Sequence, residues 1–142
     1  MIMDHQFETK VVRVSNAVAA GTSAINSTVV DTQGYDGVEF LVPFGAIVSG
    51  GVQSVKAQSG DQSDLSDAAD MSGSSITVAD DDDNKIARVN VIRPLKRYVR
   101  CVVSRATQNS TVDGIIAILY KGKKGKEAED STVCSATTVA NI

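Results

Sequence analysis

The sequence predicts an all-β protein, a single antiparallel β-sandwich or jelly-roll-like domain. The chain holds 20 Val and 10 Ile but only 4 Leu. Side chains branched at Cβ pack well on a pleated sheet but lose rotamer freedom in helices. Short apolar segments recur about every ten residues between turn-forming residues, a spacing typical of a sandwich or jelly roll. The 142 residues suffice for one domain with a buried core.

The expected sandwich begins with Phe7 to Val14, which mixes Thr, Val and charged residues as a half-exposed strand does. A stretch of small residues follows, and a short Thr- and Val-rich strand is expected over residues 26–31. Residues 38–44, with the sequence VEFLVPF, form the first strongly apolar strand. Pro43 and Gly45 are expected to close it, because proline in a sheet is typical of strand ends and edges.

Residues 46–58 keep a β-type pattern but contain Gly50 and Gly51, which predict a tight turn or a bulge. Residues 59–75 are rich in Asp, Ser and Gly, with an Asp at every third position from Asp61 to Asp70. This spacing is compatible with a short amphipathic helical turn over the core, and equally with a plain loop.

Four further strands are expected in the second half of the chain. Residues 76–79 and 85–92 flank the acidic turn, defined as Asp80 to Asn84, and are predicted to form a hairpin across it. Residues 98–106 and 112–120 are predicted to form a second pair, joined by the sequence TQNST. Each of these two contains a continuous apolar patch, CVV or IIAIL, so both are expected to lie centrally in a sheet.

The expected β-sandwich domain spans residues 7–121, between an N-terminal extension of residues 1–6 and a C-terminal arm of residues 122–142. Both end segments are expected to be flexible, and the Lys- and Gly-rich start of the arm cannot bury apolar area. The last ten residues are strand-forming in composition. They are expected either to fray or to dock on a neighbouring subunit by adding a strand to an exposed sheet edge.

Little in the sequence supports catalysis. The single histidine, His5, lies in the N-terminal extension, and neither a GxxxxGK[ST] nor a GxGxxG phosphate-binding motif is present. Cys101 and Cys134 are 33 positions apart, without the paired spacing of a zinc site. Cys101 is expected to be a core residue between Val99 and Val103. We therefore expect that the protein is not an enzyme and that it binds no cofactor.

The acidic turn is the best candidate for a cation site, because hard oxygen ligands suit calcium. It lacks the mid-loop Gly and the closing Glu of an EF-hand, however. Neighbouring carboxylates in a turn also tend to point to opposite faces. A solvated turn without a metal is therefore the preferred interpretation.

Charge is segregated along the sequence. Between Asp61 and Asp83 there are eight acidic and no basic residues, whereas between Lys85 and Lys126 there are eleven basic residues and one acidic residue. The basic residues are expected either to cluster at one sheet end and meet an acidic surface, or to solvate the outer faces. Nucleic acid is not an expected partner, because the pI is near 5.0 and no aromatic residues alternate with the basic ones.

No membrane partner and no secretion are expected. The first residues lack a basic region followed by an apolar stretch, and no apolar run is long enough to span a bilayer. The protein is therefore expected to be made in the cytoplasm.

Two sequence runs carry a resemblance to a known class of proteins. The first starts at Ala57 and reads AQSGDQSDLSDAADMSGSSITVADDDDNK, and the second reads VIRPLKRYVRCVVSRATQNSTVDGIIAILY. From about Gly34 to Lys121 the chain resembles the small virion proteins of tailed bacteriophages known as capsid decoration or cement proteins. The most recognisable parts are the Asp-rich loop before ITVAD and the strand entry at Arg93 to Arg100.

The resemblance implies a β-sandwich, often a homotrimer, on the outer surface of the mature capsid, where it stabilises contacts between major capsid proteins without turnover. Alternatives are a head–tail joining or tail component and, from a different class, a carbohydrate-binding adhesion module, for which an aromatic content of 4% is low. The candidate capsid- or subunit-binding residues are Arg88, Arg93, Lys96, Arg97, Arg100, Lys121, Lys123 and Lys124.

Overall fold

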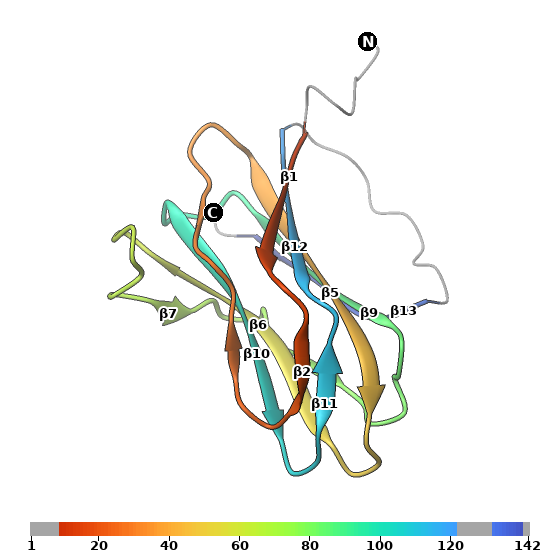
Figure 1. Ribbon diagram of the computed structural model, residues 1–142. Coiled ribbons are helices and arrows are strands. Elements are labelled where there is room, and N and C mark those ends of the chain that lie inside the picture. The colour runs from red at the N-terminus through yellow and green to blue at the C-terminus, as the bar shows by residue number, and fades with distance from the viewer. Residues whose placement is uncertain (1–8, 122–131, 141–142) are drawn as a thin grey trace.

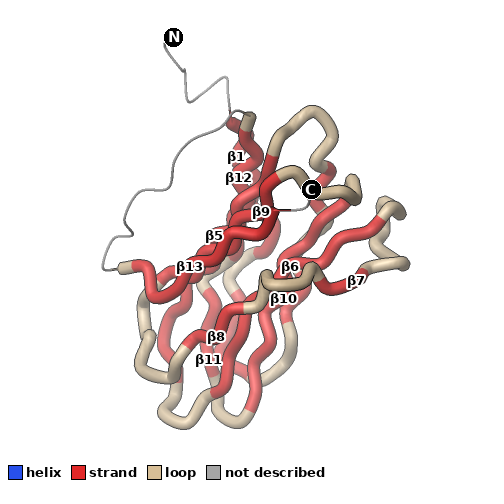
Figure 2. The backbone as a smooth tube through the Cα atoms, turned by 180° about the vertical axis from the view of Figure 1, so that it is seen from behind, coloured by secondary structure: helices blue, strands red, loops and turns tan. Residues whose placement is uncertain are grey.

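Two β-sheets packed face to face form the protein (Figures 1 and 2). The computed structural model describes residues 9–121 and 132–140, which contain thirteen strands and no helix. The described residues therefore contain no helix that could cross a membrane. The N-terminal extension, His5 and the Lys- and Gly-rich start of the C-terminal arm lie outside the described residues.

The first sheet consists of five rows of strands. In spatial order the rows are β1/β2, β12/β11, β5, β9 and β13, where β2 continues β1 and β11 continues β12 beyond irregularities in the pairing. The strands are β1 (Thr9–Ser15), β2 (Val18–Gly21), β5 (Gly37–Ile47), β9 (Ile86–Ile92), β11 (Ser110–Val112), β12 (Ile115–Tyr120) and β13 (Val133–Ala140).

The second sheet consists of four rows, in the order β3/β4, β10, β6 and β7/β8. Both β3 and β4 pair with β10, and both β7 and β8 pair with β6. The strands are β3 (Ile25–Asn26), β4 (Val30–Asp31), β6 (Val52–Gly60), β7 (Ala69–Asp70), β8 (Ile76–Val78) and β10 (Tyr98–Ala106).

With β13 set aside, the eight remaining rows have the order of a jelly roll. Numbered along the chain, they follow 1-8-3-6 in the first sheet and 2-7-4-5 in the second. Two antiparallel sheets with this interleaving are the double Greek key of jelly-roll domains. The predicted fold class is therefore confirmed, and so are the central positions of β10 and β12.

Alternating side chains of both sheets meet in a core of β-branched and aromatic residues. On β5, the inward side chains of Val38, Phe40, Val42 and Phe44 are almost completely buried. Cys101 on β10 is also completely buried, which confirms it as a core residue, and burial raises the pKa of its thiol because the thiolate is disfavoured away from water.

Both predicted hairpins are wrong. β8 pairs with β6 in the second sheet, whereas β9 pairs with β5 in the first, so the acidic turn crosses between the sheets. The TQNST segment likewise connects β10 in the second sheet to β11 in the first. Alternation in a sequence reports which side of a strand is buried. In a jelly roll, two successive strands can bury the expected sides while belonging to opposite sheets.

Pro43 does not lie at a strand end or edge, because β5 is a central strand that continues to Ile47. On one side of β5, the partner changes at this point: Leu41 pairs with Ile116 on β12, and Phe44 pairs with Val112 on β11. Two residues of β5 thus face three residues of the partner row, which is a bulge. A bulge is one of the few places inside a sheet where proline is tolerated.

The glycine-rich and Asp-rich segments are turns. The turn at residues 48–51 joins β5 to β6, with Gly50 at a φ of 89°, as the predicted tight turn requires. Residues 61–68 form turns without a helix, which favours the plain-loop alternative. Leu65 anchors this loop by burying its side chain, and Asp67 accepts hydrogen bonds from the backbone N–H groups of Asp61 and Gln62.

The acidic turn is fastened to the neighbouring turn by two of its carboxylates. Asp83 Oδ2 accepts a hydrogen bond from the backbone N–H of Ile47 (2.9 Å), and Asp80 Oδ2 accepts one from Gly50 (2.6 Å). Both carboxylates thus provide acceptors for backbone donors at the end of β5 and in the turn after it. The turn is therefore less solvated than predicted, since its Asp side chains hold the crossing from one sheet to the other.

The strand-forming end of the C-terminal arm forms β13, which pairs in parallel with β9 of the same chain. Val139 is its one described side chain that enters the core. Docking of this strand on a neighbouring subunit remains a prediction.

We predict that Asp83→Ala lowers the free energy of unfolding by about 1–2 kcal/mol, because the partly buried N–H of Ile47 loses its acceptor. Urea denaturation followed by circular dichroism measures the change. Asp81→Ala is the matched control, since Asp81 is exposed in the same turn, and it should leave the stability within about 0.5 kcal/mol of the parent. Equal effects of the two substitutions would show that the hydrogen bond does not hold the crossing.

Candidate functional site

Two loops that each cross from one sheet to the other meet at one end of the sandwich. Residues 32–36 connect β4 to β5, and residues 93–97 connect β9 to β10. Together they are called the loop end. The acidic turn lies at the other end, because β9 starts beside it at Ile86 and reaches the loop end at Ile92.

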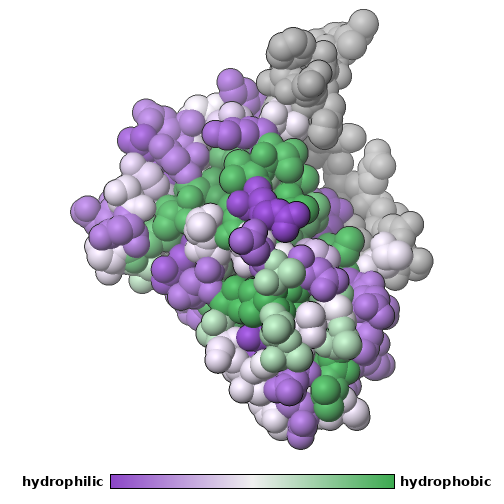
Figure 3. Space-filling model, in the orientation of Figure 1, coloured by the Kyte–Doolittle hydropathy of each residue, from purple (hydrophilic) through white to green (hydrophobic). Residues whose placement is uncertain are grey.

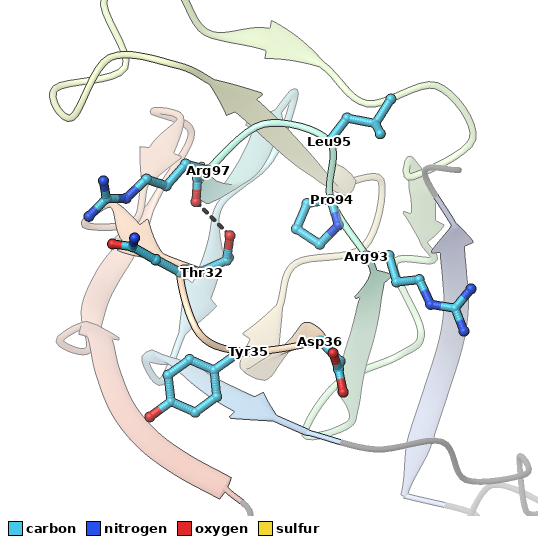
Figure 4. A pocket seen from close by; sticks show the side chains of 8 residues that line it. Thr32, Tyr35, Asp36, Arg93, Pro94, Leu95 and Arg97 are labelled. Atoms are coloured by element: carbon cyan, nitrogen blue, oxygen red, sulfur yellow. Dashed lines mark hydrogen bonds between the residues drawn. The ribbon is translucent and has the colours of Figure 1, made fainter.

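Backbone hydrogen bonds fix the two loops to each other. The N–H of Arg93 donates to the carbonyl oxygen of Asp36 (2.7 Å), and the N–H of Thr32 donates to that of Arg97 (3.0 Å). The hydroxyl of the buried Thr32 donates to the same carbonyl oxygen (2.6 Å; Figure 4). Arg93 has a φ of 48°, a left-handed conformation that is uncommon outside glycine and turns the chain sharply at the end of β9.

A pocket of about 410 Å³ lies between the two loops. Pro94 points into it, whereas the side chains of Arg93, Leu95 and Arg97 point outward around it (Figure 4). The remaining lining residues are Thr32, Gln33, Tyr35 and Asp36. The pocket thus combines an apolar wall, a tyrosine ring and charges of both signs.

Four predicted binding residues come together here. Arg93, Lys96 and Arg97 belong to the loop end, and the Lys121 Nζ lies 5.7 Å from the centre of the Tyr35 ring, within range of a cation–π interaction. Part of the predicted cluster at one sheet end therefore exists.

Arg88 and Arg100 do not belong to that cluster. Arg88 lies on the outer face of the first sheet, where it forms a salt bridge with Glu39 on β5 (2.6 Å). Arg100 lies on the outer face of the second sheet and donates to Gln58 on β6 (2.9 Å). Lys123 and Lys124 lie outside the described residues.

At the loop end, salt bridges neutralise two of the basic residues. Lys96 forms a salt bridge with Asp61 (2.7 Å), and Arg97 binds both carboxylate oxygens of Asp31 (2.8 Å each). The Arg97 guanidinium also lies 5.1 Å from the centre of the Tyr98 ring. Within the described part of the chain, the Arg93 guanidinium forms no hydrogen bond or ion pair.

Another of the basic residues, Arg105, is buried between the sheets and not on the surface. Its guanidinium donates to the carbonyl oxygens of Ala19, Ser23 and Ser110, at 2.6–3.0 Å. It therefore ties β10 to the far end of the β1/β2 row, and its role is structural.

The Arg97 guanidinium holds the pKa of the Asp31 carboxyl at about 2, well below its ordinary value of 3.8. The largest cause is the hydrogen bond from Arg97, followed by that from the N–H of Gln33. Because the folded-state pKa is lowered, this pair stabilises the loop end above pH 3.8, and the stabilisation disappears as the pH falls towards 2.

Sequence reasoning missed Leu95, whose side chain is 70% exposed, more than any other large apolar side chain of the described residues. The available signal was an apolar residue directly after proline in an otherwise basic run, Arg93 to Arg97. Its neighbours are held by the hydrogen bonds and salt bridges above, so Leu95 is presented to solvent on a fixed loop.

A second apolar surface lies on the outer face of the first sheet. Apolar side chains gather over β1 and β12, with hydrophilic side chains among them (Figure 3). Val11 on β1 is exposed, and Ile116 and Ile118 on β12 are half-buried beside it. The Arg88–Glu39 salt bridge interrupts this face.

Among the described residues, no three His, Cys, Asp or Glu side chains are close enough together to hold an ion. In the acidic turn, Asp82 accepts from the backbone N–H of Ala79 (3.0 Å) and forms a salt bridge with Lys85 (3.1 Å).

Comparison with known proteins gives no identification: no family model matches the sequence, and no curated protein matches it significantly. The function is therefore argued from the site and from the resemblance of the sequence runs.

We predict that Arg97→Gln raises the pKa of Asp31 from about 2 towards 3.8, because the carboxylate loses its guanidinium partner. Titration of the side-chain carboxyl carbons by NMR measures this shift. Lys96→Gln is the matched control, since Lys96 lies in the same loop but pairs with Asp61, and it should leave the Asp31 titration unchanged. An unchanged Asp31 pKa in Arg97→Gln would disprove the assignment of Arg97 as the cause.

Proposed function

We propose that the protein is a structural component of a tailed-bacteriophage virion that binds the outer surface of the mature capsid and stabilises contacts between major capsid proteins. It acts as a homo-oligomer, with a trimer as the expected form, and transforms no substrate. The jelly-roll fold supports this proposal, because such domains recur in viral capsids, although fold by itself does not define function. The resemblance of the Asp-rich loop and the Arg93 to Arg100 strand entry supports it independently.

The exposed Leu95 on its fixed loop carries the proposal. Binding energy at protein interfaces is concentrated in a few side chains, among which Trp, Tyr and Arg are enriched. An exposed leucine that becomes buried against a partner also contributes, through the apolar area that it removes from water. Leu95 is 70% exposed, and Arg93 on the same loop also points outward, in another direction (Figure 4). Since the loop is already ordered by contacts with residues 32–36, binding costs little further conformational entropy.

Selectivity for the mature lattice explains how such a protein stabilises a capsid without turnover. A ligand that binds one state of an assembly and not another stabilises that state by mass action. An oligomer that holds several loop ends contacts several capsid proteins at once, and linked contacts raise the overall affinity without any new kind of contact. Separation of the capsid proteins then requires several loop ends to be released.

Carbohydrate binding is the candidate from a different class, after the joining or tail component, because Tyr35 lines a pocket together with polar side chains and jelly rolls also occur in lectins. The Lys121 ammonium over the Tyr35 ring argues against it, since a sugar would stack on the same kind of ring face. A glycan array probed with the purified protein separates the two functions. Selective glycan binding that Tyr35→Ala abolishes would favour the adhesion module.

We predict that purified virions of the phage that encodes this chain contain it in regular amounts, with density on the outside of the shell in a cryo-electron reconstruction. Density at the portal vertex or in the tail would replace the capsid proposal by the joining or tail alternative. Absence of the chain from the purified particles would overturn both.

We predict that Leu95→Ser weakens binding to expanded, undecorated heads at least about tenfold, because burial of a leucine contributes roughly 1.5–3 kcal/mol. Co-sedimentation over a range of protein concentrations measures the affinity. Val48→Ser is the matched control, since Val48 is 48% exposed at the opposite end of the sandwich, and it should bind as the parent does. If Leu95→Ser binds normally, the loop end is not the capsid-binding surface.

A further inference from the structure

The parallel strand β13 is an addition to a fold that is complete without it. The eight rows of the jelly roll are all formed by residues 9–120, and β13 extends the first sheet beyond β9 as a ninth row. Without β13, the outer edge of β9 would present unpaired N–H and C=O groups. Such an edge is a ready acceptor for an added strand.

The contacts of β13 are those of a docked strand. It follows β9 from the pair Val133↔Ile86 to the pair Ala140↔Ile92. Val139 is buried, and the Thr137 hydroxyl donates to the carbonyl oxygen of Gly73, in the connection between β7 and β8 (3.4 Å). The strand therefore joins the first sheet by backbone pairing and also touches the edge of the second, which closes one side of the sandwich (Figure 2).

The chain before β13 is longer than docking on its own β9 requires. β12 ends at Tyr120, opposite Gly37, and β9 ends beside the same glycine, whereas β13 starts at the other end of β9. To reach its own β9, the chain must return about 20 Å along the strand and about 14 Å across the sheet, roughly 25 Å in total. The twelve residues 121–132 can span up to about 40 Å.

We propose that the edge of β9 is a strand-acceptor site and that, in the oligomer, it binds β13 of a second copy of this chain. This inference rests on the self-association in the proposed function, but not on capsid binding. The contacts in the exchanged form are the same as within one chain, so the exchange has a low energetic cost. Each copy has one donor strand and one acceptor edge, and such a head-to-tail arrangement forms a ring when the rotation between neighbouring copies closes.

Two cysteine variants of the full chain test the exchange. Asn90 on β9 and Thr138 on β13 are Cα partners across the strand pair. Neighbouring strands lie about 4.7–4.9 Å apart, which is within the range of Cα separations that a disulfide spans. Asn90→Cys and Thr138→Cys are made separately, each with Cys134→Ser, and the two proteins are unfolded, mixed and refolded together. Cys101 is buried and does not compete. After mild oxidation, we expect a band shift from monomer to covalent dimer on a non-reducing gel, because only exchange brings the two positions together.

Val11→Cys mixed with Thr138→Cys is the matched control, since β1 forms the opposite edge of the same sheet, and this mixture should give no covalent dimer on the non-reducing gel. The double variant Asn90→Cys/Thr138→Cys completes the test: exchange gives covalent oligomers, whereas pairing within one chain gives a closed monomer. The inference would be overturned if the double variant gave a closed monomer and the mixture of single variants gave no covalent dimer. It would also be overturned if neither the double variant nor the mixture formed a disulfide. Head binding by the same variants is scored separately, so strand exchange and capsid binding can fail independently.

Discussion

Burial of β-branched side chains between two sheets is the interaction on which the rest of this structure depends. Because most successive strands belong to opposite sheets, the chain must cross the edge of the core repeatedly, and the crossings gather at the two ends of the sandwich. Their backbone groups find partners in side chains, such as Asp83 at one end and Thr32 at the other. The hydrogen bonds that satisfy these backbone groups also fix the loops. A candidate binding surface thereby has a defined shape.

The sequence was sufficient for the fold class and for the buried faces of its strands, because Val and Ile content and alternation are local properties. Cys101 and the central positions of β10 and β12 follow from the same signals. Strand partners do not, since alternation is satisfied equally well in either sheet. The hairpin predicted across the acidic turn failed for this reason, and Pro43 was misassigned because its bulge depends on the spacing of a partner more than sixty residues away.

The candidate site shows the same limit. The run from Arg93 to Arg97 could be recognised as basic, but the acids that neutralise it, Asp61 and Asp31, are 35 and 66 positions away from their partners in the sequence. Exposed pairs of this kind contribute little to stability, yet they remove much of the net charge that the sequence suggested for this surface. Recognition at the loop end therefore depends more on shape and on Leu95 than on a basic patch.

The strand order has a consequence for how the chain acquires its structure. Among the eight jelly-roll rows, only β6 and β7/β8 are neighbours both along the chain and within a sheet. Nearly every pairing must therefore close a long segment before it gains any contact, and chains of this kind fold in milliseconds to seconds. During that interval unpaired edges are open to intermolecular association, so the rate of synthesis and the crowding of nascent chains become factors in the yield of native protein.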